Sequence, residues 1–366
     1  MMDELGRHLE PETLLRWYDG NARQLPWREN VTPYTVLISE IMLQQTRVNV
    51  AIPFYHRFLQ SYPDFHSLAG VSLEQVLKSW QGLGYYNRAR ALHRLAQIVC
   101  EEHGGVLPET SKALLALPGI GQYTAGAIQS IAFGQRCCAV DGNVLRILYR
   151  LVGETAPVTS GSVKRKWTVQ LESLLPDRAG DFNQALMDLG AGLCTPGQPD
   201  CAHCPLNRGC IACREQTAAI IPTKLPAKER QRQVFTIIVL CDADRILMRQ
   251  RPHSGLLAGL WEFPGIPGHH EPLEVLRQLG LPASLAENAR KLDGHTHVFT
   301  HRIWELDAWL VLLKPGFAQA CSVDGMIWTC REQLRDRLPV ASAYGTFLAM
   351  VLKGDLHGPA PEPRKT

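Results

Sequence analysis

The chain has 366 residues, of which 45% are hydrophobic and 20% charged, with a formal net charge of +3. This length and composition are typical of a globular protein with two domains, each able to bury its own core. The small positive charge does not by itself indicate nucleic-acid binding, and no apolar run reaches the roughly 18 residues that a membrane span needs.

Residues 9 to about 190 have the apolar spacing of helices throughout. Apolar residues recur three and four positions apart in the segments 34–60, 73–83, 87–103 and 111–117. Short breaks rich in glycine and proline separate these segments. We therefore expect an all-α domain with short connections over residues 1–213.

Glu40 is the only charged residue in the apolar helical stretch 36-VLISEIML-43. Its neighbours Leu37, Ile41 and Leu43 leave no polar face around it. A carboxyl group buried in such surroundings has a raised pKa, which makes Glu40 a candidate proton donor. The structural alternative is a glutamate that reaches solvent from a core helix.

The stretch 112-KALLALPGIGQYTAGAIQSIAF-133 contains two helical segments joined by a Pro-Gly-x-Gly turn. Gly119 and Gly121 bring bare N–H groups to the start of a helix, where they can bind phosphate. A lone G-x-G would indicate only a turn between helices. The full pattern L-P-G-I-G before an amphipathic helix is instead the helix-hairpin-helix signature of sequence-independent binding to the DNA backbone.

Asp141 directly precedes an apolar-periodic helical stretch and is therefore expected to cap it. The helix dipole and the backbone N–H groups also keep such a carboxylate ionised. Asn143, in the first turn, can donate to a nearby phosphate or carboxylate. A protonated carboxyl group at Glu40 and an ionised one at Asp141 together suit cleavage of a glycosidic bond through an oxocarbenium-like transition state.

Four cysteines in the run 194-CTPGQPDCAHCPLNRGC-210 have the spacing C-x6-C-x2-C-x5-C. Structural zinc sites usually combine two C-x2-C pairs, whereas here one close pair is flanked by single cysteines. Such a loop can wrap a 4Fe–4S cluster with one thiolate on each iron, so the spacing favours this cluster over zinc. The expected ligands are Cys194, Cys201, Cys204 and Cys210, and Cys213 is interpreted as a spare cysteine outside the spacing.

The composition and the apolar spacing of the sequence change after this run. Residues 214–233 are polar, contain two prolines and are expected to form an interdomain linker. A β-hairpin is predicted over 234–251, because a β-branched run, a polar turn and a second strand follow one another. Further strands at 297–313 and 326–329 and a helix near 343–352 indicate an α+β domain over 234–355. The tail 356–366 is expected to be disordered.

Over most of residues 10–213 the chain resembles the adenine DNA glycosylase branch of the endonuclease III superfamily. The motifs that carry the resemblance are 25-LPWR-28, 39-SEIMLQQTRV-48, 82-GLGYY-86, 119-GIGQYTAG-126, 140-VDGNV-144 and 183-NQALMDLGAGLCTP-196. The resemblance implies removal of adenine mispaired with 8-oxoguanine or guanine in double-stranded DNA, as a step of base excision repair. It also implies a 4Fe–4S cofactor on the four cysteines.

The resemblance assigns roles to individual residues. Glu40 is implied to protonate adenine at N7 and Asp141 to stabilise the oxocarbenium ion, with Tyr123 and Asn143 positioning Asp141 and the sugar. The residues implied to form the pocket for the extruded base are Arg23, Trp27, Arg28, Leu43 and Gln184. Gln45 and Tyr85 are implied to enter the helix beside the orphaned 8-oxoguanine.

Tyr123 separates this branch from the bifunctional members of the superfamily. Those members have a lysine at this position, whose amine forms a Schiff base with the sugar. A tyrosine cannot do this, so we predict a monofunctional glycosylase.

The stretch 251-RPHSGLLAGLWEFPG-265 resembles a Nudix fold around its substrate loop. No R-E-x-x-E-E follows Gly265, and 270-HEPLEVLRQLG-280 cannot supply the clustered glutamates that bind Mg²⁺, so pyrophosphohydrolase activity is not expected. In the resembled family this domain recognises 8-oxoguanine with a Phe-Ser-His triplet, which reads Phe299, Thr300 and His301 here. Threonine keeps the hydroxyl donor and adds a methyl group.

Two other hypotheses stay open at this point: a non-catalytic iron–sulfur protein that binds DNA or senses redox state, and an endonuclease III-like glycosylase-lyase. The cysteine run is expected to shape the Cys194–Cys201 loop, with Arg208 nearby, as a DNA-backbone contact and not to do chemistry. Charged residues are scattered through the first thirty positions, so no targeting segment is predicted. We expect a monomer with no membrane association, in the cytoplasm of a bacterium and associated with the nucleoid.

Overall fold

The computed structural model describes residues 4–158, 161–223, 229–320 and 322–354. The chain divides into two compact units, of which unit 1 contains residues 1–70 and 91–226 and unit 2 contains residues 71–90 and 227–366. The expected tail 356–366 and residues 224–228 of the expected linker lie outside the described residues. No helix in the described part of the chain has both the length and the apolar character to span a membrane.

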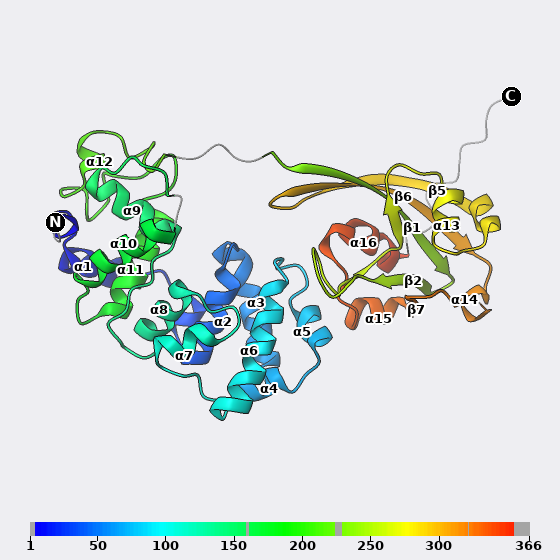
Figure 1. The fold of residues 1–366 in the computed structure, drawn as a ribbon, viewed down its shortest axis with the longest axis horizontal. Helices are drawn as coiled ribbons and strands as arrows, with labels where there is room; N and C mark the ends of the chain where they lie inside the picture. Colours follow the sequence, from blue (N-terminus) through cyan, green and yellow to red (C-terminus); the bar gives the residue numbers. More distant parts are fainter. Residues whose placement is uncertain (1–3, 159–160, 224–228, 321, 355–366) are drawn as a thin grey trace. The chain divides into compact units, whose positions relative to one another are not determined.

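Unit 1 is helical, as the apolar spacing predicted (Figure 1). Its helices are α1 (Pro11–Asn21), α2 (Pro33–Leu43), α3 (Val48–Ser61), α4 (Phe65–Ala69), α6 (Asn87–His103), α7 (Ser111–Ala116), α8 (Gln122–Ile131), α9 (Gly142–Val152), α10 (Gly161–Glu172), α11 (Ala179–Gly192) and α12 (Ile211–Arg214), with 3₁₀ turns η1 (Leu5–Arg7) and η2 (Pro26–Arg28). The first residues of α6 fall in unit 2. The predicted segment 34–60 covers two helices, because Gln45 between them takes a left-handed φ of 59°.

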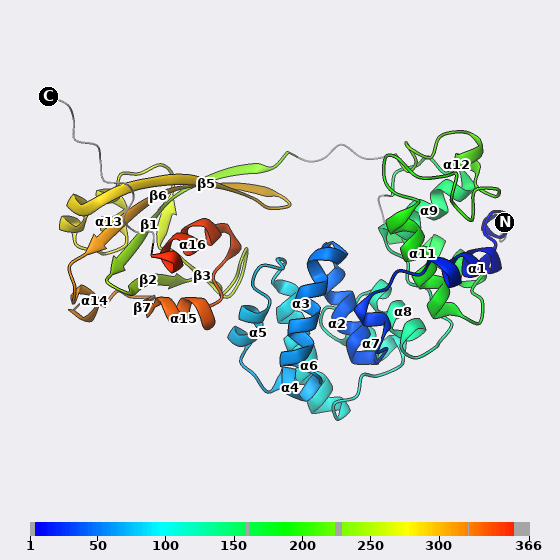
Figure 2. The same ribbon diagram turned by 180° about the vertical axis from the view of Figure 1, so that it is seen from behind.

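Helix α2 is the central element of unit 1. It begins with a capping box between Thr32 and Thr35 and with Pro33 in its first turn, both of which favour helix initiation. Its residues from Tyr34 to Met42 are all buried, since α2 contacts α3 and α8 (Figures 1 and 2). Glu40 therefore lies on a helix that has no solvent-facing side at this point.

A second core cluster of unit 1 forms around α9 and α11, which contact each other. Leu148 and Leu189 are fully buried within it. Cys194, Cys201, Cys204 and Cys210 are half-buried and pack against the same cluster. The cysteine run is thus attached to the core that carries α9.

The described residues of unit 2 form a seven-stranded sheet with helices around it. Its elements are α5 (Leu73–Ser79), β1 (Gln231–Asp242), β2 (Arg245–Gln250), β3 (Trp261–Glu262), β4 (Gly265–Pro267), α13 (Pro272–Gln278), η3 (Ala283–Asn288), β5 (Ala289–Val298), β6 (Arg302–Leu313), α14 (Phe317–Ala320), β7 (Met326–Cys330), α15 (Arg331–Asp336), η4 (Ser342–Tyr344) and α16 (Gly345–Lys353). The strand order is β3-β2-β1-β6-β5, with β4 paired to β1 and β7 to β2. Strands β1 and β6 are parallel over their whole length.

Both faces of β1 are buried, as expected of a central strand. Ile238 and Leu240 share a core with Val275 and Leu276 of α13, while Ile237 and its like-facing neighbours are buried on the opposite face. Figure 1 shows α13 and α16 on either side of the twisted sheet. The α+β architecture and the hairpin of β1 and β2 agree with the sequence analysis.

One predicted strand of unit 2 is interrupted. The run 297–313 contains the end of β5, a turn at 299–301 and the whole of β6, and β5 and β6 pair antiparallel. The backbone N–H of Phe299 donates to the carbonyl oxygen of Arg302 at 2.8 Å and closes the turn. The triplet Phe299, Thr300 and His301 therefore lies at the tip of a β-hairpin.

Candidate active site and cysteine pocket

Glu40 is buried, as its apolar surroundings predicted, with 6% of its surface exposed. Burial raises the pKa of its carboxyl group from 4.5 to about 7. A hydrogen bond with Tyr123 and the charge of Arg28 lower this pKa, whereas the neighbouring Asp141 raises it. Glu40 therefore holds a proton on a substantial fraction of molecules at neutral pH.

Tyr123, near the start of α8, is the hydrogen-bond partner of the Glu40 carboxyl group. Its hydroxyl also lies 3.7 Å from Sδ of Met187. Burial and the nearby carboxyl groups of Glu40 and Asp141 raise the pKa of Tyr123 well above 10. The phenol therefore stays protonated, and its O–H donates a hydrogen bond to Glu40 when the Glu40 carboxyl group is ionised.

Asp141 caps α9, as predicted, and both of its oxygens have partners. Oδ1 accepts a hydrogen bond from the backbone N–H of Val144 at 2.7 Å, and Oδ2 accepts one from Nδ2 of Asn143 at 2.8 Å. The Oδ1 atom of Asn143 in turn accepts from Nη1 of Arg146 at 2.9 Å. The carboxylate is thereby fixed in orientation, close enough to Glu40 to act on its pKa.

The segment that leads into α9 is held by Gly126 and Asn183, two residues that the sequence analysis did not single out. A Cβ atom on Gly126 would lie 1.9 Å from the carbonyl oxygen of Cys138, so only glycine allows this close approach to α8. Asn183 is fully buried. Its Nδ2 donates to the carbonyl oxygen of Cys137 at 2.8 Å, and its Oδ1 accepts from the N–H of Ala139 at 3.1 Å. These contacts place Asp141 beside α8.

Asp188 on α11 is a further residue that the sequence analysis missed. Its side chain is 2% exposed and bridges two of the predicted pocket residues. It accepts hydrogen bonds from Nε of Arg23 at 2.8 Å and from Nη1 and Nη2 of Arg28 at 2.9 Å each. Burial would raise the pKa of Asp188, but the hydrogen bonds from Arg28 and Arg23 outweigh it and lower that pKa. Asp188 thus stays ionised and orients both guanidinium groups.

The remaining predicted pocket residues of unit 1 are near the same helices. Trp27 is buried and packs edge-on against Tyr55, with 5.4 Å between ring centroids. Leu43, at the end of α2, and Gln184, one helical turn before Asp188 on α11, are half-buried. Gln45 is exposed in the turn after α2 and has a φ of 59°.

The predicted hairpin of helices is present as α7 and α8 with a five-residue turn between them. Gly119 has a φ of 82°, which favours glycine, and Gly121 is the N-cap of α8. Both glycines are exposed. The first backbone N–H groups of α8 therefore face solvent next to Tyr123.

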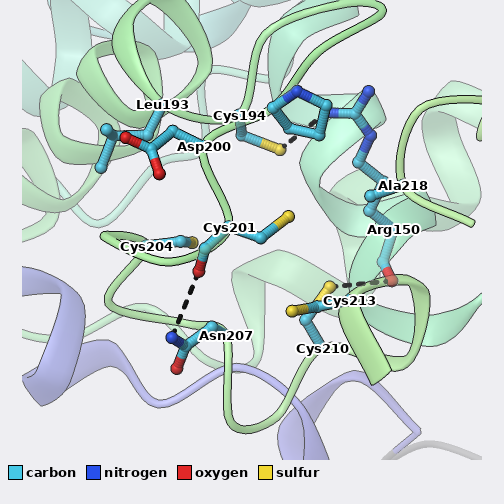
Figure 3. A pocket seen from close by; sticks show the side chains of 11 residues that line it. Arg150, Leu193, Cys194, Asp200, Cys201, Cys204, Asn207, Cys210, Cys213 and Ala218 are labelled. Atoms are coloured by element: carbon cyan, nitrogen blue, oxygen red, sulfur yellow. Dashed lines mark hydrogen bonds between the residues drawn. The ribbon is translucent and has the colours of Figure 1, made fainter. Parts of the chain in front are cut away.

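The four predicted cysteine ligands line one pocket of about 290 Å³, a volume that includes space open to solvent (Figure 3). Cys213, which the spacing placed outside the cluster as a spare cysteine, lines the same pocket. Burial raises the pKa of Cys204 to about 12, and a cationic partner is needed to keep such a thiolate. Within the described ranges, no three His, Cys, Asp or Glu side chains are grouped as ligands of a single metal ion.

Two arginines of α9 connect this pocket to the Asp141 end of the helix. Arg146 donates through Nε to the carbonyl oxygen of Cys194 at 2.8 Å. Arg150, which is 2% exposed, donates through Nη1 to Sγ of Cys194 at 3.1 Å and to the carbonyl oxygen of Thr195 at 2.9 Å. One helix therefore carries Asp141 at its start and supports the cysteine loop along its length.

The predicted recognition residues of unit 2 lie at the β5–β6 hairpin tip and in the turn before α6. The Phe299 ring packs edge-on against His297 and Trp304, with centroid distances of 4.6 and 5.0 Å. Thr300 and His301 are exposed. Within unit 2, the Thr300 hydroxyl lies 3.1 Å from the hydroxyl of Tyr85, which is 47% exposed and has a φ of 50°.

Two family models match the chain. The model described as "HhH-GPD superfamily base excision DNA repair protein" matches residues 38–170, and the model described as "NUDIX domain" matches residues 235–350. These ranges correspond to the helical part and to the sheet-containing part of the fold.

Similar proteins cover nearly the whole chain. The adenine DNA glycosylase of Rattus norvegicus is 36% identical over 88% of this chain and 74% of its own length. The adenine DNA glycosylase of Buchnera aphidicola subsp. Acyrthosiphon pisum is 35% identical over 84% of this chain and 87% of its own length. Among solved structures, a thermostable thymine-DNA glycosylase is 31% identical with a TM-score of 0.52, over 57% of this chain and 97% of that one.

Proposed function

The chain belongs to the adenine DNA glycosylases of base excision repair, and on this premise we propose that it removes adenine paired with 8-oxoguanine or guanine. The observation that carries the proposal is Glu40, a buried carboxyl group with a pKa of about 7 beside Tyr123 and Asp141. A general acid is most effective when its pKa is close to the working pH.

Glu40 acts in its protonated form and transfers the proton to N7 of the extruded adenine. The bond from C1′ to the base then breaks, and its electron pair leaves with the neutral purine. Asp141 stabilises the positive charge that develops on the sugar. Water adds at C1′, and the Glu40 carboxylate can accept the proton that this water loses.

Asn143 and Tyr123 keep the two carboxyl groups in place for these steps. Asn143 donates a hydrogen bond to Oδ2 of Asp141. This hydrogen bond holds the Asp141 carboxylate in the orientation in which its charge faces the sugar. Tyr123 donates to Glu40 once Glu40 has lost its proton. This hydrogen bond stabilises the carboxylate that forms in the first step.

The pocket for the adenine base consists of Arg23, Trp27, Arg28, Leu43 and Gln184. The guanidinium groups of Arg23 and Arg28 are anchored by Asp188 at 2.7 and 2.9 Å. The Nε atom of Arg28 is buried and has no hydrogen-bond partner among the described residues, so it is an available donor. Enzymes that act on an extruded base read it in this way, by polar contacts and apolar packing.

DNA contacts are assigned to three exposed turns. The N–H groups after Gly119 and Gly121 suit a backbone phosphate. Gln45 and Tyr85 are exposed non-glycine residues with positive φ, a strained conformation that recurs at functional sites. We propose that both enter the DNA helix beside the orphaned 8-oxoguanine.

Release of adenine should proceed without cleavage of the DNA strand. Tyr123 occupies the position where lyases of this superfamily have a lysine, and its phenol cannot form a Schiff base with the sugar. The enzyme would therefore be monofunctional.

Unit 2 is assigned to recognition of 8-oxoguanine through the hairpin tip. Thr300 and His301 are exposed there, and the Phe299 ring is held by its aromatic neighbours. The Thr300 hydroxyl can donate to a polar edge of the oxidised base, as a serine would. The Glu274 carboxylate of α13 forms an ion pair with His270 at 2.8 Å. We propose no pyrophosphohydrolase activity for unit 2.

The cysteine pocket fits a 4Fe–4S cluster. Cys194, Cys201, Cys204 and Cys210 would hold it with their thiolates, and the buried Arg150 donates to Sγ of Cys194. When bound, the cluster would cross-link the run from Cys194 to Cys210 and shape the Cys194–Cys201 loop, with Arg208 nearby, as a contact to the DNA backbone. The catalytic residues lie outside the run.

The same proposal extends to assembly and location. We expect a monomer that acts on double-stranded DNA in the bacterial cytoplasm, at the nucleoid. Light scattering on the free protein and on its complex with DNA tests the monomeric state.

Base release from labelled duplexes containing 8-oxoguanine:A, G:A and T:A pairs tests the function. We expect fast release of adenine from the first, slower release from the second and none from the third. Glu40→Gln and Asp141→Asn should each abolish release and retain DNA binding. A non-catalytic protein would release no base from any duplex, and efficient crosslinking by borohydride would identify a glycosylase-lyase.

A further inference from the structure

The pocket of the cysteine run is lined by five thiols, one more than a 4Fe–4S cluster needs. Cys213 is half-buried, forms no disulfide and faces the same space as the four predicted ligands (Figure 3). In a pocket with one iron for each of four thiolates, a fifth sulfur is a surplus donor. The question is whether it is placed to bind iron.

Helix α12 fixes the position of Cys213. Cys210 is the N-cap of this helix, and Cys213 follows three residues later on the same face. Ala212 between them is fully buried in the core, and α12 contacts α9. The Cys213 sulfur is therefore held at the pocket by the same core that supports Cys210.

Cys213 lies on the side of the pocket towards which one of the predicted ligands points. In Figure 3 the Cys201 side chain extends towards the side of the pocket where Cys210 and Cys213 lie, and Cys201 and Cys213 are both free cysteines. Cys204 lies on the other side of the pocket from Cys210 and Cys213 in Figure 3. Cys213 therefore lies on the Cys201 side of the pocket and away from Cys204.

We propose that Cys213 is a reserve iron ligand that takes the place of Cys201 on the cluster. When Cys201 is absent or detached, the Cys213 thiol releases its proton to solvent and its sulfur binds the vacated iron. No electron is transferred in this exchange. The inference rests on the proposed 4Fe–4S cofactor and concerns a residue outside the four-cysteine spacing.

Iron content of the purified full-length chain tests the proposal. The variants are Cys201→Ala, Cys213→Ala, the double variant and Cys204→Ala, with Cys100→Ala as a control for loss of a thiol elsewhere. We expect about four irons per chain and the visible absorbance of the cluster in wild type, Cys213→Ala, Cys100→Ala and Cys201→Ala. The double variant and Cys204→Ala should lose most of their iron. Equal iron content in Cys201→Ala and the double variant would overturn the proposal.

A second measurement uses chains that keep all four predicted ligands. Iron is removed from wild type and Cys213→Ala by a chelator, and the decay of the visible absorbance is followed. The variant should lose its cluster several-fold faster, because a transiently detached Cys201 has no substitute. Identical rates would contradict a reserve ligand. Wild-type protein without iron would instead contradict the cofactor on which the inference rests.

Discussion

Replacement of Tyr123 by phenylalanine tests the electrostatic account of Glu40. The hydrogen bond from Tyr123 favours the ionised form of Glu40 and so lowers its pKa, against the larger effect of burial. Tyr123→Phe removes only this hydroxyl. A hydrogen bond to a charged group is worth about 1.5–3 kcal/mol, and one pKa unit corresponds to about 1.4 kcal/mol. The pKa of Glu40 should therefore rise by about one unit or more.

The pH dependence of base release measures this change. Glu40 must be protonated to act, so the single-turnover rate should be constant at low pH and fall about tenfold per pH unit above the pKa. With a pKa of about 7, wild type keeps roughly one tenth of its plateau rate at pH 8. Tyr123→Phe should keep about half of its own plateau rate at pH 8.

A matched control is available on the same helix as Glu40. Tyr34 is also buried, and its hydroxyl donates to the carbonyl oxygen of Tyr62 at 2.7 Å. In Tyr34→Phe the rate should fall over the same pH range as in wild type. The reasoning is refuted if the rate of Tyr123→Phe falls over the same pH range as in wild type or at lower pH.

Three further substitutions test other parts of the molecule. Asp188→Asn leaves two arginines without a buried carboxylate, which should lower the free energy of unfolding by about 3 kcal/mol. A thermal melt should then show a Tm lower by about 10 °C. An unchanged Tm would contradict a bridge between Asp188 and the two arginines. Thr300→Val removes the hydroxyl at the hairpin tip and should reduce the rate ratio between 8-oxoguanine:A and G:A duplexes several-fold, whereas Thr300→Ser should preserve it. Gly126→Ala would place a Cβ atom 1.9 Å from the carbonyl oxygen of Cys138, and should either prevent folding or lower the excision rate at least tenfold, as a rate assay alongside a circular dichroism spectrum would reveal.

Residues whose environment is local in sequence were the ones that could be predicted. Glu40 stands alone in an apolar stretch, and its burial follows from its immediate neighbours. Asp141 directly precedes an apolar-periodic helix, so its capping role also follows from adjacent residues. The turn with Gly119 and Gly121 carries its own signature for the same reason.

Residues that act through distant partners were missed. In 186-LMDLG-190, Asp188 has the pattern of an ordinary polar helix position, and its partners Arg23 and Arg28 precede it by 165 and 160 residues. The one available signal was its position four residues after Gln184, on the same helical face. Cys213 lies outside the C-x6-C-x2-C-x5-C spacing, and a linear pattern does not show that α12 brings it to the pocket of the four predicted ligands.

Helix α9 affects how sequence variants of this enzyme should be interpreted. The helix rises about 14 Å from its N-cap carboxylate to Arg150. Hydrogen bonds from Arg146 and Arg150 connect it to Cys194. A strain that carries a change in the cysteine run could therefore lose catalysis although the altered residue does not contact the substrate. Loss of activity alone does not show that the altered residue is catalytic. Measuring DNA binding and base release together separates a displaced Asp141 carboxylate from a lost contact to DNA.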